Sequence, residues 1–291
     1  MTELALVHLV RRVNGIGPLE RFIASYRAHA AGVDHELILL CKGFPGGRLA
    51  EDHAQLLAGL PHRLFFVPDR AFDIGPYFAA ARRYDFRYFC FLNSFSRILG
   101  DGWLAHLERH ARASGTGLVG ATCSCQSFAH SHEGRSVVDR MRHVATAGSA
   151  SLMAQRAGSW VLGSVGLWRP SRHFPEFPNY HVRTNGFMAA RELLLRVRVP
   201  PLPFKLSAFM FESGREGLTA QVLAMGLRAL LVDRRGVAFD KEEWHRANAF
   251  RQARQEDLLI ADNQTDAYER AAPPQRAELS RLAWGPHARS G

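Results

Sequence analysis

Residues 87–99 read Arg-Tyr-Phe-Cys-Phe-Leu-Asn-Ser-Phe-Ser-Arg-Ile-Leu. The apolar half, Tyr88 to Leu92, predicts a buried strand that ends abruptly in small polar residues. A turn at residues 100–102 and a helix from Trp103 follow. In open α/β sheets, ligands bind just beyond the carboxyl ends of the strands. This stretch therefore predicts the fold class and places a binding site at Asn93 to Ser96.

The same alternation of strand and helix extends over the first 121 residues. Apolar runs typical of strands occupy four further segments, Leu4–Val10, His35–Cys41, Arg63–Val67 and Gly117–Ala121. Apolar residues at helical spacing predict helices at Pro18–Ala31, Ala50–Leu57, Pro76–Tyr84 and Trp103–Ala113. Asp101 is the expected cap of the last helix. The alternation implies right-handed βαβ units and a sheet covered on both faces.

Beyond residue 121 the alternation becomes irregular. Two further strands and two further helices are predicted, at Arg183–Ala190, Leu227–Val232, Arg191–Val197 and Leu218–Met225. The proline-rich residues 200–203 predict a rigid break. We expect residues 1–240 to form one α/β domain with a mixed, mostly parallel, Rossmann-type sheet flanked by helices. Residues 241–291 are expected to pack on it as an extension, with flexible last residues from Gly285.

The composition favours a folded protein that does not span a membrane. Of 291 residues 47% are hydrophobic, and no apolar run approaches the roughly 20 residues that a bilayer crossing needs. The net charge of +10 comes from scattered arginines, and no nucleic-acid-binding motif accompanies them. Peripheral contact with an anionic membrane stays open. The first residues lack the basic segment of a signal peptide, so a cytoplasmic protein is expected.

The four cysteines predict no disulfide framework. Cys41 and Cys90 fall inside predicted strands, where buried free thiols are expected. Cys123 and Cys125 are too close in sequence for an easy disulfide. As metal ligands they would need partners such as His130 or His132, and the alternative is a polar loop.

Four groups of polar residues are expected to gather at one place. Arg11-Arg12-Val13-Asn14 follows the first strand, residues 69–75 follow the third, and residues 93–96 follow the fourth. Parallel strands end at the same edge of a sheet, so these three groups would share one crevice. The fourth group, Phe211-Glu212-Ser213-Gly214, comes just before the helix expected from Leu218.

A series of short motifs follows in a characteristic order. They are Asp73-Ile-Gly75-Pro-Tyr77, the strand and turn from Tyr84 to Ser94, Asp101-Gly-Trp103-Leu, Gly117-Leu-Val-Gly-Ala-Thr122, Phe187-Met-Ala-Ala-Arg191, and Glu212 with the helix and strand after it. In this order they resemble bacterial glycosyltransferases of the GT-A fold, close to the large inverting family 2. The resemblance covers roughly residues 4–235.

The resemblance implies a GT-A-like fold and the transfer of a sugar from a nucleotide-sugar donor to a glycan or glycoconjugate acceptor, in bacterial surface polysaccharide synthesis. In such an inverting transfer, a carboxylate takes the proton of the attacking hydroxyl. Glu212 is the expected general base, and the alternative is an acid that balances a helix dipole. The expected donor-binding residues are Arg11, Arg12, Asn14, Asp73, Gly75, Asn93, Ser94 and Ser96. The expected acceptor-binding residues are His181 and Asn185.

This chain departs from the family pattern at the end of the fourth strand. Metal-dependent members carry paired acids there, which hold a divalent cation against the diphosphate. This chain has Asn-Ser-Phe-Ser at residues 93–96, with Phe95 in place of an aspartate. No metal ligand is assigned, and two hypotheses stay open. Either arginines replace the metal, namely Arg11, Arg12 and Arg97, or Mg²⁺ or Mn²⁺ is held by Asp69 and Asp73.

Two further interpretations accompany this one. Residues 244–246 with Arg251 would form a C-terminal lid on the diphosphate, in which His245 would be a late metal ligand. A second class of function is a GT-A-like protein that binds a glycan or nucleotide without catalysis. The missing acids favour that alternative, whereas the retained Glu212 favours an enzyme.

Overall fold

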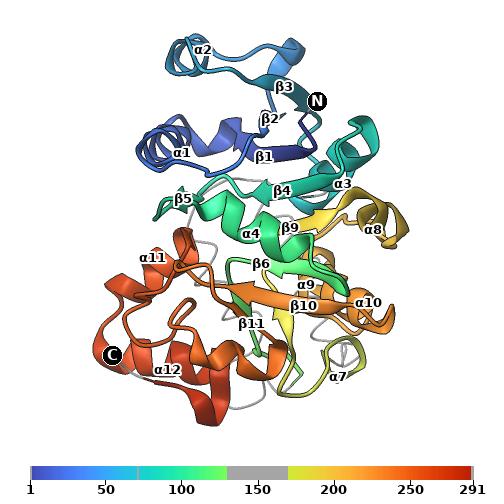
Figure 1. Ribbon diagram of the computed structural model, residues 1–291, viewed down its shortest axis with the longest axis vertical. Coiled ribbons are helices and arrows are strands. Elements are labelled where there is room, and N and C mark those ends of the chain that lie inside the picture. Colours follow the sequence, from blue (N-terminus) through green and yellow to red (C-terminus); the bar gives the residue numbers. More distant parts are fainter. Residues whose placement is uncertain (1, 71, 130–169, 290–291) are drawn as a thin grey trace.

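An eight-stranded mixed sheet runs through the computed structural model, which describes residues 2–70, 72–129 and 170–289 (Figure 1). The strand order is β11-β10-β6-β9-β4-β1-β2-β3. Their bounds are β1 Leu4–Arg11, β2 Glu36–Lys42, β3 Arg63–Val67, β4 Tyr88–Leu92, β6 Thr116–Gly120, β9 Gly186–Ala190, β10 Arg228–Val232 and β11 Ala238–Phe239. β9 and β11 run against the other six, so six carboxyl ends and the amino end of β9 meet at one edge.

The central strands are apolar apart from His8 and Arg11 of β1, because both faces of the sheet are covered. In β1, Ala5 and Val7 belong to one hydrophobic core, and Leu4 and Leu6 belong to the other. Successive side chains of a strand point to opposite faces, so this alternation supplies two cores from one strand. The predicted α/β fold with a mixed, mostly parallel sheet flanked by helices is confirmed.

Helices cover both faces of the sheet. On one face α1 (Gly17–Ala28) and α4 (Trp103–Ala111) pack with residues such as Phe22 and Leu104. On the other face lie α3 (Ile74–Arg83), α8 (Arg191–Arg196), α9 (Lys205–Ser213) and α10 (Leu218–Ala224). Short elements complete this part of the chain, namely η1 Arg12–Asn14, η2 Pro45–Gly47, α2 Glu51–Leu56, β5 Arg97–Ile98, β7 Cys123–Ser124, α7 Pro170–His173 and β8 His181–Val182.

The C-terminal segment packs against the β10 end of the sheet (Figure 1). Its elements are η3 Lys241–Arg246, β12 Ile260–Ala261, α11 Asn263–Arg270, α12 Pro273–Trp284 and η4 Gly285–His287. β12 pairs with β5, and Trp244 and Trp284 are buried in the core. Arg289 donates to two carbonyl oxygens of η3 at 2.9 and 3.0 Å. These contacts join the end of the described chain to η3.

One local prediction was wrong and one helix was not predicted. The break at residues 200–203 is present, and α9 follows it from Lys205, where no helix had been expected because of the prolines just before it. The cap of α4 is Gly102, with φ 68°, and not Asp101. The Asp101 carboxylate instead accepts a hydrogen bond from the backbone N–H of Ala30 at 3.0 Å, which fixes the end of α1.

The four cysteines are free and buried, as expected for Cys41 and Cys90. His130 and His132, the partners that a Cys123–Cys125 metal site would need, lie outside the described residues. Within residues 2–70, 72–129 and 170–289, none of the helices combines the length and apolar character that a bilayer crossing requires.

Candidate functional site at the carboxyl edge of the sheet

Charged residues converge beyond β1, β2 and β3. Arg11, the last residue of β1, donates two hydrogen bonds to Asp69, each 3.1 Å long. Lys42, the last residue of β2, is 2% exposed, and its Nζ lies 2.5 Å from the carbonyl oxygen of Phe72 and 3.4 Å from Asp69. Burial lowers the pKa of Lys42, and the carboxylates of Asp69 and Asp73 oppose that shift. Of the predicted donor residues, Arg11 is thus brought together with Asp69 and with Lys42, which had not been predicted for the site.

Asp73 occupies the N-cap position of α3, but its side chain makes no capping hydrogen bond. Burial raises the pKa of its carboxyl, and the nearby Glu212 adds to the rise, whereas Lys42 and Arg11 oppose it. A carboxylate in such surroundings lacks the backbone N–H partners of a cap. The Asp73 side chain therefore does not cap α3.

Three other predicted donor residues lie close in sequence to this group. Arg12 and Asn14 belong to η1, directly after β1, and Arg12 is exposed. In the described part of the chain no side-chain partner binds the Arg12 guanidinium. Gly75 lies in the first turn of α3. These residues remain available to a ligand at this edge.

The polar turn after β4 is mostly engaged in holding itself together. The Asn93 side-chain oxygen accepts hydrogen bonds from the Phe95 N–H at 2.9 Å and from the Ser96 hydroxyl at 3.1 Å. Ser96 is fully buried, and its hydroxyl also lies 3.0 Å from the carbonyl oxygen of Asn185. Ser94 is 5% exposed. Asn93 keeps its amide group for a ligand, whereas Ser96 stabilises the turn.

Glu212 lies in the last turn of α9 and reaches the amino end of β9. Its Oε2 accepts hydrogen bonds from the Thr184 N–H at 2.8 Å and from the Thr184 hydroxyl at 2.5 Å. Among the described residues, Oε1 has no partner. An acid at the carboxyl end of a helix opposes the dipole rather than balancing it. The helix-start alternative for Glu212 is therefore wrong.

The two predicted acceptor residues flank this contact and are both buried. His181 is 5% exposed, and its Nδ1 lies 2.8 Å from the carbonyl oxygen of Asn179, so Nε2 bears the lone pair of the neutral ring. Burial lowers the pKa of His181, and the nearby Glu212 opposes the shift. Asn185 is 4% exposed and accepts from the Thr122 hydroxyl at 2.6 Å, while its Nδ2 has no partner among the described residues.

Two of the three arginines expected to replace a metal are already paired, whereas Arg12 has no side-chain partner among the described residues. Arg11 is bound to Asp69, and Arg97 donates to Asp266 at 2.9 Å. Two other arginines approach the same edge, Arg183 from the segment between β8 and β9 and Arg251 from the C-terminal segment. Arg251 had been expected beside the diphosphate as part of the lid, whereas Arg183 had not been linked to it. Arg183 donates to the buried Asp262 at 3.1 Å, and Arg251 lies beside it. Asp262 also caps α11, since its side chain accepts from the N–H groups of Gln264 and Thr265.

The residues at the edge do not fit an acidic metal site. Among the described residues, no three His, Cys, Asp or Glu side chains are close enough to hold a metal ion together. The β4 turn offers neutral oxygens that are already engaged, and Asp69 would have to exchange Arg11 and Lys42 for the cation. Hard divalent cations prefer several free carboxylate oxygens.

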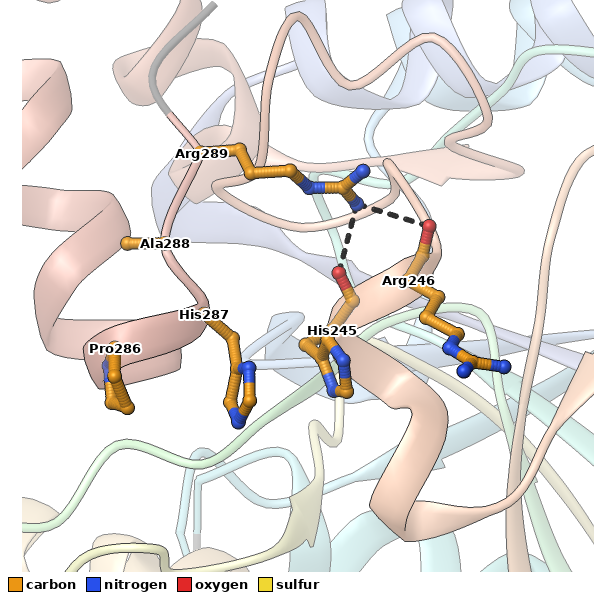
Figure 2. Close-up of a pocket in the computed structure, with 6 residues that line it drawn as sticks. All are labelled: His245, Arg246, Pro286, His287, Ala288 and Arg289. Atoms are coloured by element: carbon orange, nitrogen blue, oxygen red, sulfur yellow. Dashed lines mark hydrogen bonds between the residues drawn. The ribbon is translucent and has the colours of Figure 1, made fainter.

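A separate hollow of about 350 Å³ lies between η3 and the chain end (Figure 2). Figure 2 shows the rings of His245 and His287 side by side, stacked with centroids 4.1 Å apart, and Arg289 folded back onto the carbonyl oxygens of η3. None of its lining residues belongs to the edge group. Trp244 is fully buried and Arg246 pairs with Glu243, so residues 244–246 do not form the expected lid, and His245 stays apart.

Of two residues that build the site but were not predicted, one could have been found from the sequence. The chain has few lysines, and Lys42 stands directly after an apolar strand, which is an unusual place for a solvated charge. Thr184 lies within the polar run before β9, but nothing in the sequence pairs it with Glu212, 28 residues away.

No protein-family model and no curated protein matches the sequence. Among the solved structures that the fold resembles is a mannosyltransferase from Pyrobaculum calidifontis, determined in complex with GDP-mannose and Mn²⁺. The two chains are 11% identical, and the match covers 84% of this chain and 59% of that one, with a TM-score of 0.45. This chain thus covers less than two thirds of the mannosyltransferase, and a similarity of this size does not identify a function.

Proposed function

We propose that this protein is a glycosyltransferase that moves a sugar from a nucleotide-sugar donor to a hydroxyl group of a glycan or glycoconjugate acceptor. The observation that carries the proposal is the Glu212 carboxylate at the polar edge of the sheet. One of its oxygens is fixed by Thr184, and the other has no partner among the described residues. A carboxylate held in this way is oriented to accept a proton.

In the proposed reaction the acceptor oxygen attacks the anomeric carbon and its proton passes to Oε1 of Glu212. The bond between the anomeric carbon and the diphosphate oxygen breaks, and both electrons of that bond leave with the nucleoside diphosphate. Attack from the face opposite the leaving group inverts the anomeric centre. His181 and Asn185 are the proposed acceptor contacts, since they flank Thr184.

The proposed donor contacts lie on the β1 to β4 side of the edge. They are Arg11, Arg12, Asn14, Asp73, Gly75, Asn93 and Ser94, with Lys42 added and Ser96 as support of the turn. Membership of family 2 and a bacterial surface polysaccharide as product are proposed from the motif resemblance, and peripheral contact with an anionic membrane is proposed from the net charge. A cytoplasmic location is proposed as the sequence analysis expects it.

A thermal-shift screen with UDP-, GDP-, dTDP- and CMP-sugars, with and without Mg²⁺ or Mn²⁺, tests donor binding. A donor at about 100-fold excess over its Kd adds roughly 2.7 kcal/mol of stability. The donor that is found is then assayed for release of nucleoside diphosphate. We expect Glu212→Gln to lower turnover by about 10²- to 10⁴-fold while donor binding is retained.

The control is Glu216→Gln, an exposed acid four residues further along. Near-normal turnover of Glu212→Gln would exclude the proposed base. Binding of a nucleotide sugar without turnover in the wild type would favour the alternative, a non-catalytic binding protein, which the missing acids after β4 also suggest. Absence of a shift with every donor would contradict both.

A further inference from the structure

Arg183, in the segment between β8 and β9, links this edge of the sheet to the C-terminal segment. Its guanidinium donates to Asp262 at 3.1 Å, and its Nη1 lies 3.5 Å from the hydroxyl of Thr122, two residues beyond β6. The guanidinium carbon lies 4.1 Å from the centroid of the Phe250 ring. The side chain is 12% exposed, so this charge is held in a largely dry environment at the sheet edge.

Arg251 approaches the same ring. Its guanidinium carbon lies 5.0 Å from the Phe250 centroid, and its two terminal nitrogens donate to the amide oxygens of Gln126 and Gln264 at 3.3 and 2.8 Å. Its Nε–H is buried and has no partner among the described residues. Neutral amide oxygens satisfy hydrogen bonds, but they leave the positive charge of Arg251 uncompensated.

The cluster of Arg183, Arg251 and Asp262 contains two cations and one anion. Asp262 is itself shared, because its Oδ1 accepts the N–H groups of Gln264 and Thr265 at 3.0 and 2.9 Å. Burial, followed by repulsion from Arg183, lowers the pKa of Arg251 to about 10. Bringing two guanidinium groups together away from water is costly unless an anion joins them. The cluster is therefore one negative charge short.

The cluster also lies next to the proposed base. Arg183 directly precedes Thr184, which holds Glu212 by two hydrogen bonds. Asn185 follows, and its buried Nδ2 likewise has no partner in the part of the chain that the structure describes. An N–H group without a partner at such a place is expected to bind an acceptor atom, and phosphate oxygens are suitable acceptors.

We propose that Arg183 and Arg251 hold the diphosphate of the nucleotide-activated donor, so that two guanidinium groups stand where related enzymes use a divalent cation. The inference rests on the proposed function. It assigns to Arg183 and Arg251 the role first expected of Arg11, Arg12 and Arg97. When the bond to the anomeric carbon breaks, the leaving oxygen gains a negative charge, and the guanidinium groups stabilise that charge.

The test measures binding of inorganic pyrophosphate, of the nucleoside diphosphate and of the matching nucleoside by calorimetry in the presence of EDTA. We expect Arg251→Gln to weaken binding of pyrophosphate and nucleoside diphosphate by about ten- to hundredfold, the usual effect of losing a hydrogen bond from a charged group. Binding of the nucleoside is expected to stay unchanged. Arg251→Lys should restore part of the affinity, because it keeps the charge without the forked geometry.

Arg254→Gln is the matched control, an exposed arginine three residues away. Arg183→Lys is used in place of a neutral substitution, because loss of the charge would leave the buried Asp262 unpaired. Urea unfolding establishes that each variant is folded.

Wild-type affinity for pyrophosphate in Arg251→Gln and Arg183→Lys would overturn the inference, and so would binding that disappears in EDTA. If those variants also turn over a donor normally, the proposed glycosyl transfer stands, but without a role for Arg183 and Arg251 in holding the diphosphate. If the wild type binds pyrophosphate through Arg251 but binds no nucleotide sugar, the anion site stands and the proposed transfer fails.

Discussion

His8 should make this protein lose stability in mild acid. The residue lies in the middle of β1, between Leu39 of β2 and Leu92 of β4, and it is fully buried. Its ring stacks on Phe22 with a centroid distance of 3.6 Å. Both ring nitrogens lack hydrogen-bond partners in the described part of the chain. Burial lowers the pKa of His8 from an ordinary 6.5 to about 3.

The sign follows from where the proton binds. Below pH 6.5 the unfolded chain takes up a proton at His8, whereas the folded protein stays neutral there until about pH 3. Stability from this residue is therefore present above pH 6.5 and is lost as the pH falls. At pH 5 the loss is about 2 kcal/mol relative to pH 8, from roughly 1.4 kcal/mol per pH unit below the unfolded pKa.

The assay is urea unfolding between pH 5 and pH 8, followed by tryptophan fluorescence, since Trp103, Trp244 and Trp284 are fully buried. In His8→Leu the pH-dependent loss should shrink by about 2 kcal/mol. The stability of this variant at pH 8 should change little, because the lost ring stacking is offset by removal of two unpaired nitrogens.

Other buried histidines, such as His181, also make the folded protein less stable as the pH falls. The test therefore compares the pH dependence of the unfolding free energy in the variant with that in the wild type. His62→Gln, at a half-buried position ahead of β3, is the matched control and should keep the wild-type slope. An unchanged slope in His8→Leu would refute the reasoning, and so would a large loss of stability at pH 8, which would mean that the nitrogens have partners.

Two further predictions concern single atoms near the site. Tyr77→Phe should leave the free energy of unfolding unchanged or raise it by up to about 2 kcal/mol, because the buried hydroxyl has no partner among the described residues; a clear loss in urea unfolding would argue against this. Gly214→Ala should cost about 1–3 kcal/mol and weaken donor turnover, because the new Cβ would overlap the Met210 carbonyl oxygen at the end of α9. Gly17→Ala, whose Cβ meets only ordinary contacts at 3.5 Å or more, is the control, and an equal effect of both changes would contradict the steric argument.

The first half of the fold could be predicted because its strands and helices are local patterns. β3 and β4 begin and end at the predicted residues, and both stand between clear turn signals. The helix α9 was not predicted, because its apolar residues are not clearly confined to one face and a proline run comes just before it. Helix capping at Asp101 failed for a related reason, since its carboxylate binds Ala30, 71 residues away.

The candidate site was predictable only in part. Topology rules place the ends of β1, β3 and β4 at one edge, and the structure has them there. The ion pairs among the site residues could not be predicted, because the sequence shows the residue types but not which charged side chains lie next to one another. Arg11 had been expected to be free for a ligand, but it is bound to Asp69. Arg183 and Arg251, which lie beside the same Phe250 ring, come from segments 68 residues apart in the chain.

The burial of all four cysteines gives this protein a built-in reporter of unfolding. Burial raises the pKa of Cys41 and of Cys125 to about 12, and it raises those of Cys90 and Cys123 as well. The thiolate is the reactive form, so thiol reagents should modify the folded protein only through opening events. The rate of labelling then measures how often each strand opens. A cysteine introduced on the surface would be the reactive one, and spectroscopic probes could be attached without removing the native thiols.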